Sequence, residues 1–510
     1  MEGVLILDFG SQYSQLIVRR SRELGINAFI IPGNSSFKDI QSYNSKAIIL
    51  SGGPHFVSQS STILPDKKIF KLGIPVLGIC YGMQSIAHIL GGKVVSSSKR
   101  EYGHAKLFIK DKSKIFNHMP NHFSCWMSHG DSVSRLPKGF KGIASTIDIP
   151  NAAITNEKKN IYCVQFHPEV THTDNGKMIL KNFLIGIAKI KKSWILENYI
   201  EQEIINIRDK VGKEKSLCAI SGGVDSAVAA TVVDKAIGKN LYCVFVDNGL
   251  LRKGEARKVK EFLTKNTGLN LKVIDARERF LNELKGVSNP EKKRKIIGRE
   301  FIKIFEEEAK KIKGVKYLVQ GTLYPDVIES ISVSGPSSII KSHHNVGGLP
   351  KKMNLKLIEP LNFLFKDEVR KLGLELNLPK ELIERHPFPG PGLAIRILGS
   401  VTKEAIVVLQ EADEIILQEI KKAGIYSKIW QAFGVLLPLK TVGVMGDNRT
   451  YGNVLALRCV ESFDGMTANW TNLSYNILQS ISNRIVNEVR GINRVVYDIT
   501  SKPPGTIEWE

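Results

Sequence analysis

Short apolar runs alternate with amphipathic, helix-like stretches along the first part of the chain. Four runs have the length and composition of buried strands: Val4–Asp8, Ala47–Leu50, Pro75–Ile79 and Ile161–Gln165. Glycine, proline and serine follow the second run at Ser51–Pro54, as expected for a loop that leaves the end of a strand. Strands that alternate with helices indicate a parallel sheet, so we expect an α/β domain over residues 1–188.

A second set of apolar runs follows a charged helical stretch, Lys189–Lys215, which we interpret as a linker helix. The runs are Leu217–Ile220, Leu241–Asp247 and Tyr317–Gln320. Their spacing predicts a central α/β domain with a doubly wound parallel sheet over residues 189–385.

Prolines interleaved with glycine in Glu384–Gly392 mark the last change of composition. The remaining residues, 386–510, carry three strand candidates and one helix candidate, which are Thr441–Met445, Val454–Cys459, Arg494–Ile499 and a helix near Thr471–Val489. This order predicts a small α+β domain.

The composition is typical of a globular protein, with 43% hydrophobic and 24% charged residues. No apolar run approaches the length of a membrane span, and the N-terminus lacks the basic region of a secretory signal. We therefore expect a cytoplasmic protein without a membrane partner.

The formal net charge of +22 has two interpretations. One is nucleic-acid binding, and the other is a lysine-rich surface with sites for anionic nucleotides. No helix-turn-helix, zinc-finger or RNA-binding signature accompanies the charge, so we expect nucleotide ligands and no nucleic-acid partner. A tRNA-modifying enzyme stays open as an alternative that would explain the charge.

One of the six cysteines stands out by its position. No pair has C-x-x-C spacing, which argues against a zinc site or a disulfide framework, and we expect four cysteines to be core residues: Cys125, Cys163, Cys218 and Cys243. Cys80 instead lies between a buried strand and a helix that starts near Met83, with Gly78 and Gly82 permitting a sharp turn. A helix N-terminus favours the thiolate, and its N–H groups can stabilise an oxyanion.

A nucleophilic cysteine needs a base, and His167 follows the end of another predicted strand. Glu169 lies two residues further and can hold the imidazole in the required tautomer. The sequence therefore predicts a catalytic triad of Cys80, His167 and Glu169; the alternative is a core cysteine beside an ordinary loop histidine.

These segments resemble the class I glutamine amidotransferases, through Ser51–Pro54, Gly78–Gln84 and Phe166–Glu169. The resemblance implies glutamine hydrolysis through a thioester on Cys80. It also implies oxyanion donors at Gly53 and Tyr81, and glutamine contacts at Gln84, Ser128 and His129. Gln84 taken alone could equally be a surface residue of a helix.

A glycine-containing loop follows the strand candidate Leu217–Ile220 and precedes a helical pattern. Such a loop can bind phosphate, because its backbone N–H groups and the helix N-terminus face the anion. The chain has neither a Walker lysine motif nor G-x-G-x-x-G, and the loop resembles that of the N-type ATP pyrophosphatases, which cleave ATP between its α and β phosphates. The predicted ATP-binding residues are Ser221, Gly222, Gly223, Val224, Asp225, Ser226, Ala227, Val246 and Gly321.

Two carboxylates three residues apart, Asp326 and Glu329, lie in a segment that follows another predicted strand. Carboxylates beside a triphosphate suggest a Mg²⁺ site, and helix capping is the alternative.

The whole sequence resembles the glutamine-hydrolysing GMP synthetases, notably at Ile340–Gly348, Arg385–Gly392 and Ser501–Glu510. The resemblance implies that ATP adenylylates the C2 oxygen of xanthosine 5′-monophosphate (XMP), and that ammonia from glutamine then displaces AMP to give GMP. It places XMP contacts at Arg252, Lys502 and Glu508, and implies a homodimer through the last domain.

Two clusters keep alternatives open. The stretch with His343 and His344 could be a lid or a metal-binding pair. The basic run Lys292–Lys295 could close over phosphates or form a solvated helix face.

Overall fold

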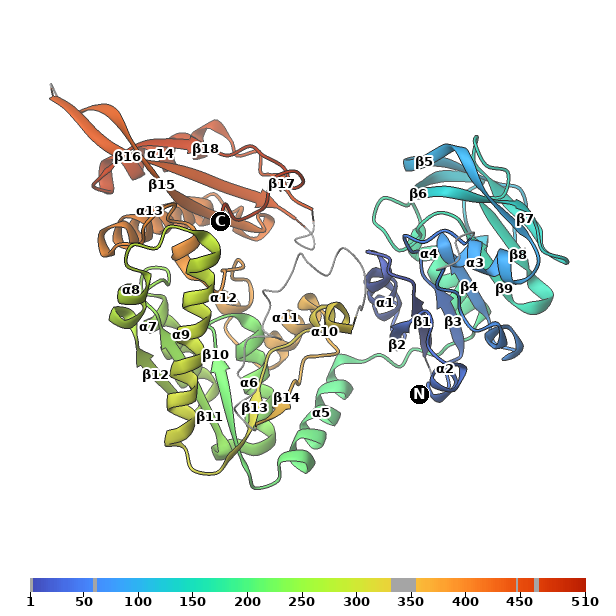
Figure 1. Cartoon of the computed structure of the whole chain (residues 1–510), viewed down its shortest axis with the longest axis horizontal. Helices are drawn as coiled ribbons and strands as arrows, with labels where there is room; N and C mark the ends of the chain where they lie inside the picture. Colours follow the sequence, from blue (N-terminus) through green and yellow to red (C-terminus); the bar gives the residue numbers. More distant parts are fainter. Residues whose placement is uncertain (1–2, 58–61, 332–354, 446–447, 463–466) are drawn as a thin grey trace. The chain divides into compact units, whose positions relative to one another are not determined.

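The computed structural model describes residues 3–57, 62–331, 355–445, 448–462 and 467–510 (Figure 1). The chain divides into two compact units, one up to Tyr199 and one from Ile200 onward. The parts predicted as separate domains on either side of residue 385 both lie in the second unit, so that boundary stays a prediction. The segment containing His343 and His344 lies outside the described residues.

The first unit is built on a nine-stranded sheet in the order β2-β1-β3-β4-β9-β8-β7-β5-β6. Five neighbouring strands are parallel: β1 (Val4–Asp8), β2 (Ala28–Pro32), β3 (Ala47–Leu50), β4 (Val76–Ile79) and β9 (Ile161–Val164). Helices α1 (Ser14–Glu23), α2 (Phe37–Ser42), α3 (Tyr81–Ile89) and α4 (Gly176–Lys181) belong to the same unit. Every residue of β3, β4 and β9 is buried, which explains why their sequences are continuous apolar runs.

The other part of this sheet is antiparallel, and the sequence analysis did not predict it. It comprises β5 (Lys93–Ile109), β6 (His122–Arg135), β7 (Lys141–Ser145) and β8 (Ala153–Asn156). In β6, buried residues alternate with more exposed ones, because one face of the strand packs inward and the other does not. Strand β6 carries Ser128 and His129, and β9 leads to His167, so the extended sheet brings both segments toward Cys80.

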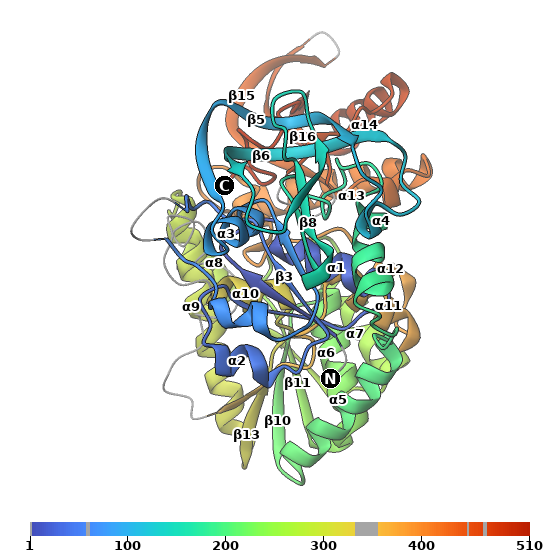
Figure 2. The ribbon, with the colours of Figure 1, turned by 90° about the vertical axis from the view of Figure 1, so that its right-hand side faces the viewer.

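The second unit contains a five-stranded parallel sheet in the order β12-β11-β10-β13-β14. The strands are β10 (Lys215–Ile220), β11 (Leu241–Asp247), β12 (Leu271–Asp275), β13 (Val315–Val319) and β14 (Lys356–Ile358). Figure 2 shows β10, β11 and β13 side by side. The helices between and after them are α6 (Val224–Ile237), α7 (Glu255–Thr267), α8 (Arg277–Leu284), α9 (Pro290–Lys311), α10 (Tyr324–Ile331), α11 (Lys366–Glu375) and α12 (Lys380–Ile383), and the predicted linker helix is α5 (Leu196–Val211).

A four-stranded sheet ends the second unit. Strands β15 (Gln431–Met445) and β16 (Asn448–Glu461) are antiparallel, and β16 also pairs with β17 (Asn469–Trp470) and β18 (Ile492–Tyr497). Helices α13 (Lys403–Lys422) and α14 (Tyr475–Glu488) pack against it, which confirms the α+β prediction. The β15–β16 hairpin extends well past these helices in Figure 1.

One apolar core is continuous across the second unit. It includes Leu217 and Val244 of the parallel sheet, Ile297 of α9, Ile416 of α13 and Leu455 of β16. Because these side chains pack into a single cluster, residues of the parallel sheet and of the last sheet are held in fixed relation within this unit.

Candidate functional site

Cys80 occupies a strained turn between β4 and α3. Its φ of 50° and ψ of −106° are rare for a residue with a side chain. The turn is held by Cys80 N–H donating to the Val164 carbonyl at 2.8 Å and by Gly82 N–H donating to Ser51 at 3.0 Å. A Cβ on Gly78 would lie 2.8 Å from backbone atoms of Gly82 and Met83, so the turn requires glycine there.

The structure places the His167 ring beside Cys80 and joins it to Glu169. Nδ1 of His167 lies 2.8 Å from a carboxylate oxygen of Glu169, and Glu169 is completely buried. Burial lowers the pKa of His167, but the charges of Glu169 and the Cys80 thiolate, with the hydrogen bonds to both, raise it well above its ordinary value. The buried carboxylate of Glu169 therefore orients the imidazole and favours its protonated form.

A backbone hydrogen-bond network fixes the position of the histidine. His167 N–H donates to the Trp126 carbonyl at 3.0 Å, and the Thr173 hydroxyl donates to the His167 carbonyl at 2.6 Å. The same threonine oxygen accepts from Trp126 N–H at 3.0 Å. The base is thus tied to β6 on one side and to the loop before α4 on the other.

Two polar groups contact the sulfur, one from β6 and one that follows β9. The Cys80 thiol donates to the Ser128 carbonyl at 3.6 Å, and the amide of Gln165 donates to the sulfur at 3.6 Å. Gln84 of α3 donates from its amide nitrogen to the Asp131 carbonyl at 2.8 Å. Gln84 is 4% exposed, so the surface alternative for this residue is wrong.

The other residues predicted to contact glutamine or its oxyanion lie around this turn. Gly53 approaches the Phe9 carbonyl so closely that a Cβ would lie 2.6 Å from its oxygen. The Tyr81 hydroxyl donates to the Ile63 carbonyl at 2.7 Å, and burial raises the pKa of this phenol. The His129 ring is buried, with Nε2 3.1 Å from Glu101 and Nδ1 3.0 Å from the Asp131 carbonyl.

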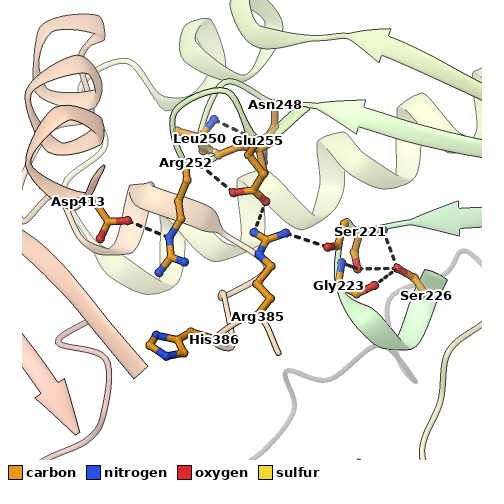
Figure 3. Close-up of polar contacts among 12 residues, drawn as sticks. Ser221, Gly223, Ser226, Asn248, Leu250, Arg252, Glu255, Arg385, His386 and Asp413 are labelled. Atoms are coloured by element: carbon orange, nitrogen blue, oxygen red, sulfur yellow. Dashed lines mark hydrogen bonds and ion pairs between the residues drawn. The ribbon is translucent and has the colours of Figure 1, made fainter. Parts of the chain in front are cut away.

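The second candidate centre is the loop between β10 and α6, shown in Figure 3. Ser226 Oγ accepts from Ser221 N–H and donates to the Gly223 carbonyl, each at 3.1 Å, so it closes the loop on itself. Ser221 Oγ accepts from Gly223 N–H at 3.3 Å, and Gly222 has a φ of 79° that favours glycine. The loop passes into the N-terminus of a 14-residue helix, which suits it to bind phosphate.

The other predicted ATP residues line the ends of neighbouring strands. Val246 is buried near the end of β11. Gly321 follows β13, and a Cβ there would lie 3.1 Å from the backbone of Asp225. Parallel strands place these ends at one edge of the sheet, where ligands bind in folds of this kind.

Arg385 connects this loop to the acidic start of α7. Figure 3 shows it between the two: its Nη1 donates to the Gly222 carbonyl at 2.8 Å and its Nη2 to Glu255. Glu255 also accepts from Arg252 N–H at 3.0 Å. Arg252 in turn pairs with Asp413 of α13 at 2.8 Å, so a continuous polar chain runs from the loop to the last part of the unit.

Glu508 and Arg252, two of the predicted XMP residues, lie near one aromatic ring. The guanidinium groups of Arg252 and Arg396 lie 5.1 and 5.0 Å from the centre of Phe388. Arg396 is fully buried and binds both carboxylate oxygens of Glu508, at 2.8 and 3.0 Å, in a bidentate pair. Lys502, the third predicted residue, pairs through its backbone with Ala468.

Asp326, one of the two carboxylates predicted to bind Mg²⁺, lies in the first turn of α10. Asp326 accepts from the backbone N–H of Leu323 at 2.9 Å, which agrees with the capping alternative. The side chain of Glu329 lies outside the described residues. Among the described residues, no group of three or more histidine, cysteine or acidic side chains has metal-binding geometry.

Several residues of these centres escaped the sequence analysis. For Gln165, the only feature of the sequence that could have indicated a place in the site is its position two residues before His167. Lys366 pairs with Asp225, and Arg396 binds Glu508, although each is remote in sequence from its partner. The solvated-face alternative for the basic run is wrong for Lys293, which is fully buried and donates to Glu510 at 2.6 Å.

Three protein-family descriptions match parts of the chain. "Glutamine amidotransferase class-I" matches residues 5–187, "Thiamine biosynthesis protein (ThiI)" matches 211–329, and "GMP synthase C terminal domain" matches 418–509. The first covers the cysteine centre, and the second covers the phosphate-binding loop.

Whole-length relatives carry one name. The chain is 57% identical over 510 residues to a protein of Brachyspira hyodysenteriae named GMP synthase [glutamine-hydrolyzing], covering 100% of this chain and 99% of that protein. Proteins of the same name from Pelodictyon phaeoclathratiforme and Chlorobium chlorochromatii are each 59% identical, with 100% of both chains covered. The chain belongs to the family of glutamine-hydrolysing GMP synthases.

Proposed function

We propose that this chain makes GMP from XMP, with ATP as the activating substrate and ammonia supplied by hydrolysis of glutamine in the same chain. The observation that carries the proposal is the pairing of Cys80, His167 and Glu169 in one unit with a phosphate-binding loop in the other. A two-step amidotransferase needs both kinds of chemistry, and among the described residues the first unit carries the triad and the second carries the loop.

Glutamine hydrolysis would proceed on Cys80. The thiolate attacks the side-chain carboxamide carbon, and the oxyanion is stabilised by N–H groups at Gly53 and Tyr81. The C–N bond then breaks, and ammonia leaves with a proton from His167, which leaves a thioester. Water, deprotonated by His167, attacks the thioester, and the C–S bond breaks to release glutamate and restore the thiolate.

ATP would bind with its phosphates on the loop Ser221–Ser226. The supporting geometry is the closed loop, its N–H groups and the N-terminus of α6. XMP would lie toward Arg252, Lys502 and Glu508, where an arginine suits its phosphate and a carboxylate suits its hydroxyl groups. The C2 oxygen of XMP would attack the α-phosphorus of ATP, the bond between the α and β phosphates would break to release pyrophosphate, and ammonia would then attack C2 and displace AMP.

Mg²⁺ is part of the proposal, as a companion of the ATP phosphates. The donor chemistry suits it, because Asp225 Oδ1 is buried without a hydrogen-bond partner among the described residues and Asp326 follows a neighbouring strand. These carboxylates, together with phosphate oxygens and water, are the ligands this ion prefers. When bound, the ion would offset charge on the phosphates.

We also propose a homodimer through the β15–β16 hairpin. The hairpin exposes large apolar side chains, namely Leu439, Val442, Val444 and Tyr451, which are between 49% and 74% exposed. Exposed apolar groups gathered on one extended element are typical of an interface. A second copy of the chain is the occupant that this surface would take.

The test of the main proposal separates the two reactions. Cys80→Ala should abolish glutamine-dependent GMP synthesis but keep synthesis from added ammonium, because the second unit supplies the XMP chemistry. Pyrophosphate release with XMP and either nitrogen source measures both. Loss of the ammonium-driven reaction in Cys80→Ala would overturn this division of roles.

A further inference from the structure

A buried amide lies beside the proposed nucleophile. Gln165 follows the end of β9, its side chain is completely buried, and its amide nitrogen lies 3.6 Å from Cys80 Sγ. This is a normal separation for an N–H group that donates to sulfur. The thiol itself points to the Ser128 carbonyl at the same distance, 3.6 Å.

Neighbouring groups determine which end of this amide faces the sulfur. The Asp131 carbonyl can only accept, so the Gln84 atom 2.8 Å from it must be the amide nitrogen. The second N–H of that nitrogen reaches the side-chain oxygen of Gln165 at 3.5 Å. With its oxygen directed at Gln84, Gln165 presents its NH₂ group to Cys80.

We propose that Gln165 is a further catalytic residue of glutamine hydrolysis, as a hydrogen-bond donor to the sulfur of Cys80, with Gln84 as the residue that positions it. The inference rests on the proposed role of Cys80. The sulfur is negatively charged before it attacks glutamine, and again when the C–S bond of the thioester breaks and the electron pair returns to sulfur. A fixed donor stabilises the sulfur in both states, while His167 transfers the protons.

Two substitutions of Gln165 test the donor. Gln165→Met keeps the volume and removes the N–H, so kcat for glutamine hydrolysis should fall roughly tenfold, as for loss of a hydrogen bond to a charged atom. The rate of Cys80 alkylation by iodoacetamide at neutral pH should fall in parallel. KM for glutamine should stay nearly constant, because the contact is made to sulfur.

Gln165→Glu distinguishes donation from packing. Glutamate has the shape of glutamine and keeps an acceptor for Gln84, so a purely structural role predicts nearly normal rates for it. A donor role predicts rates below those of Gln165→Met, because an ionised carboxylate repels the thiolate. The proposal would be overturned if Cys80 in Gln165→Met were alkylated at the wild-type rate, or if Gln165→Glu hydrolysed glutamine at the wild-type rate.

Control variants separate the role of Gln165 from the proposed role of Cys80 as the nucleophile. Gln202→Met, an exposed change in α5, should leave all rates unchanged, and every variant should retain ammonium-driven GMP synthesis. Should Gln165→Met unfold the first unit, Gln84→Met removes the orienting group instead, and Cys80 alkylation should again fall several-fold. If Cys80→Ala still hydrolysed glutamine, Cys80 would not be the nucleophile, and the proposed function itself would be wrong. If Cys80→Ala were inactive but the Gln165 variants hydrolysed glutamine at the wild-type rate, only the role of Gln165 would be wrong.

Discussion

At the scale of single residues, the charge on His167 depends on its carboxylate partner. Glu169→Gln keeps the shape but removes the charge that favours the imidazolium, so glutamine hydrolysis should fall roughly a hundredfold. Ammonium-driven GMP synthesis should be unchanged, since it belongs to the other unit. Steady-state rates with the two nitrogen sources measure this, and an equal loss of both would contradict it.

The same pair should make stability depend on pH. The folded-state pKa of His167 is raised, so its ion pair stabilises the fold fully below the unfolded pKa of about 6.5, and the contribution is lost as pH rises through the raised value. The difference in melting temperature between the parent chain and Glu169→Gln should therefore be larger at pH 6.5 than at pH 9. If this difference in melting temperature increased with pH, the ion pair would not stabilise the fold in the predicted pH range.

The three residues of the proposed triad were predictable from the sequence, because each carries its own signal. Cys80 lies between a strand and a helix, and His167 with Glu169 ends another strand. Gln165 and Glu101 carry no such signal, because their importance comes from contacts with α3 and β6 that form only when the antiparallel strands join the sheet. A polar residue in a buried network is recognisable only once its neighbours are known.

At the scale of elements, Arg385 ties the phosphate-binding loop to α7. Arg385→Lys keeps the charge but cannot reach both the Gly222 carbonyl and Glu255 with one planar group. KM for ATP should rise about tenfold, as expected when a charge-assisted hydrogen bond is lost. This KM for ATP is measured with ammonium as the nitrogen source and XMP at saturating concentration.

The matched control is Arg257→Lys, on the exposed face of α7. It should leave KM for ATP unchanged. If both variants behaved like the parent chain, the arginine bridge would have no part in shaping the loop.

Helix α9 anchors the last residue through a buried lysine. Lys293 Nζ donates to the Ala394 and Ile397 carbonyls at 3.0 and 2.7 Å and to Glu510 at 2.6 Å. Lys293→Met leaves these groups unpaired, so the free energy of unfolding should fall by about 3 kcal/mol in urea titrations. Lys292→Met, its exposed neighbour, should change it by less than about 0.5 kcal/mol. Equal effects of the two would contradict the anchoring role.

Predicted elements were correct where a strand is buried on both faces, as in β3, β4, β10 and β11. The strand β6 was missed for the same physical reason: buried and more exposed residues alternate along it, so no continuous apolar run marks it. For the basic run of α9, closure over phosphates and a solvated face both stayed open, because sequence alone could not show that Lys293 is enclosed by other elements.

At the scale of the whole molecule, the two units divide the work, and the net charge of +22 accords with anionic substrates. Among the described residues, no helix has the length and apolar character needed to cross a bilayer. The order of the units along the chain was predictable because each has its own strand and helix pattern. Their identity as one enzyme rests on the full-length relatives rather than on either site alone.

The exposed apolar side chains of the β15–β16 hairpin make a prediction about assembly. Val444 is 74% exposed, so a charged side chain there should leave the monomer fold intact but oppose burial in an interface. Val444→Lys should shift the chain from dimer to monomer, or raise the dimer dissociation constant at least tenfold, in sedimentation or light-scattering measurements over a range of protein concentrations. Ile147→Lys, at an 85% exposed apolar position of the first unit, controls for the added charge and should leave the dimer unchanged. A parent chain that is monomeric at micromolar concentration, or equal behaviour of the two variants, would rule this interface out.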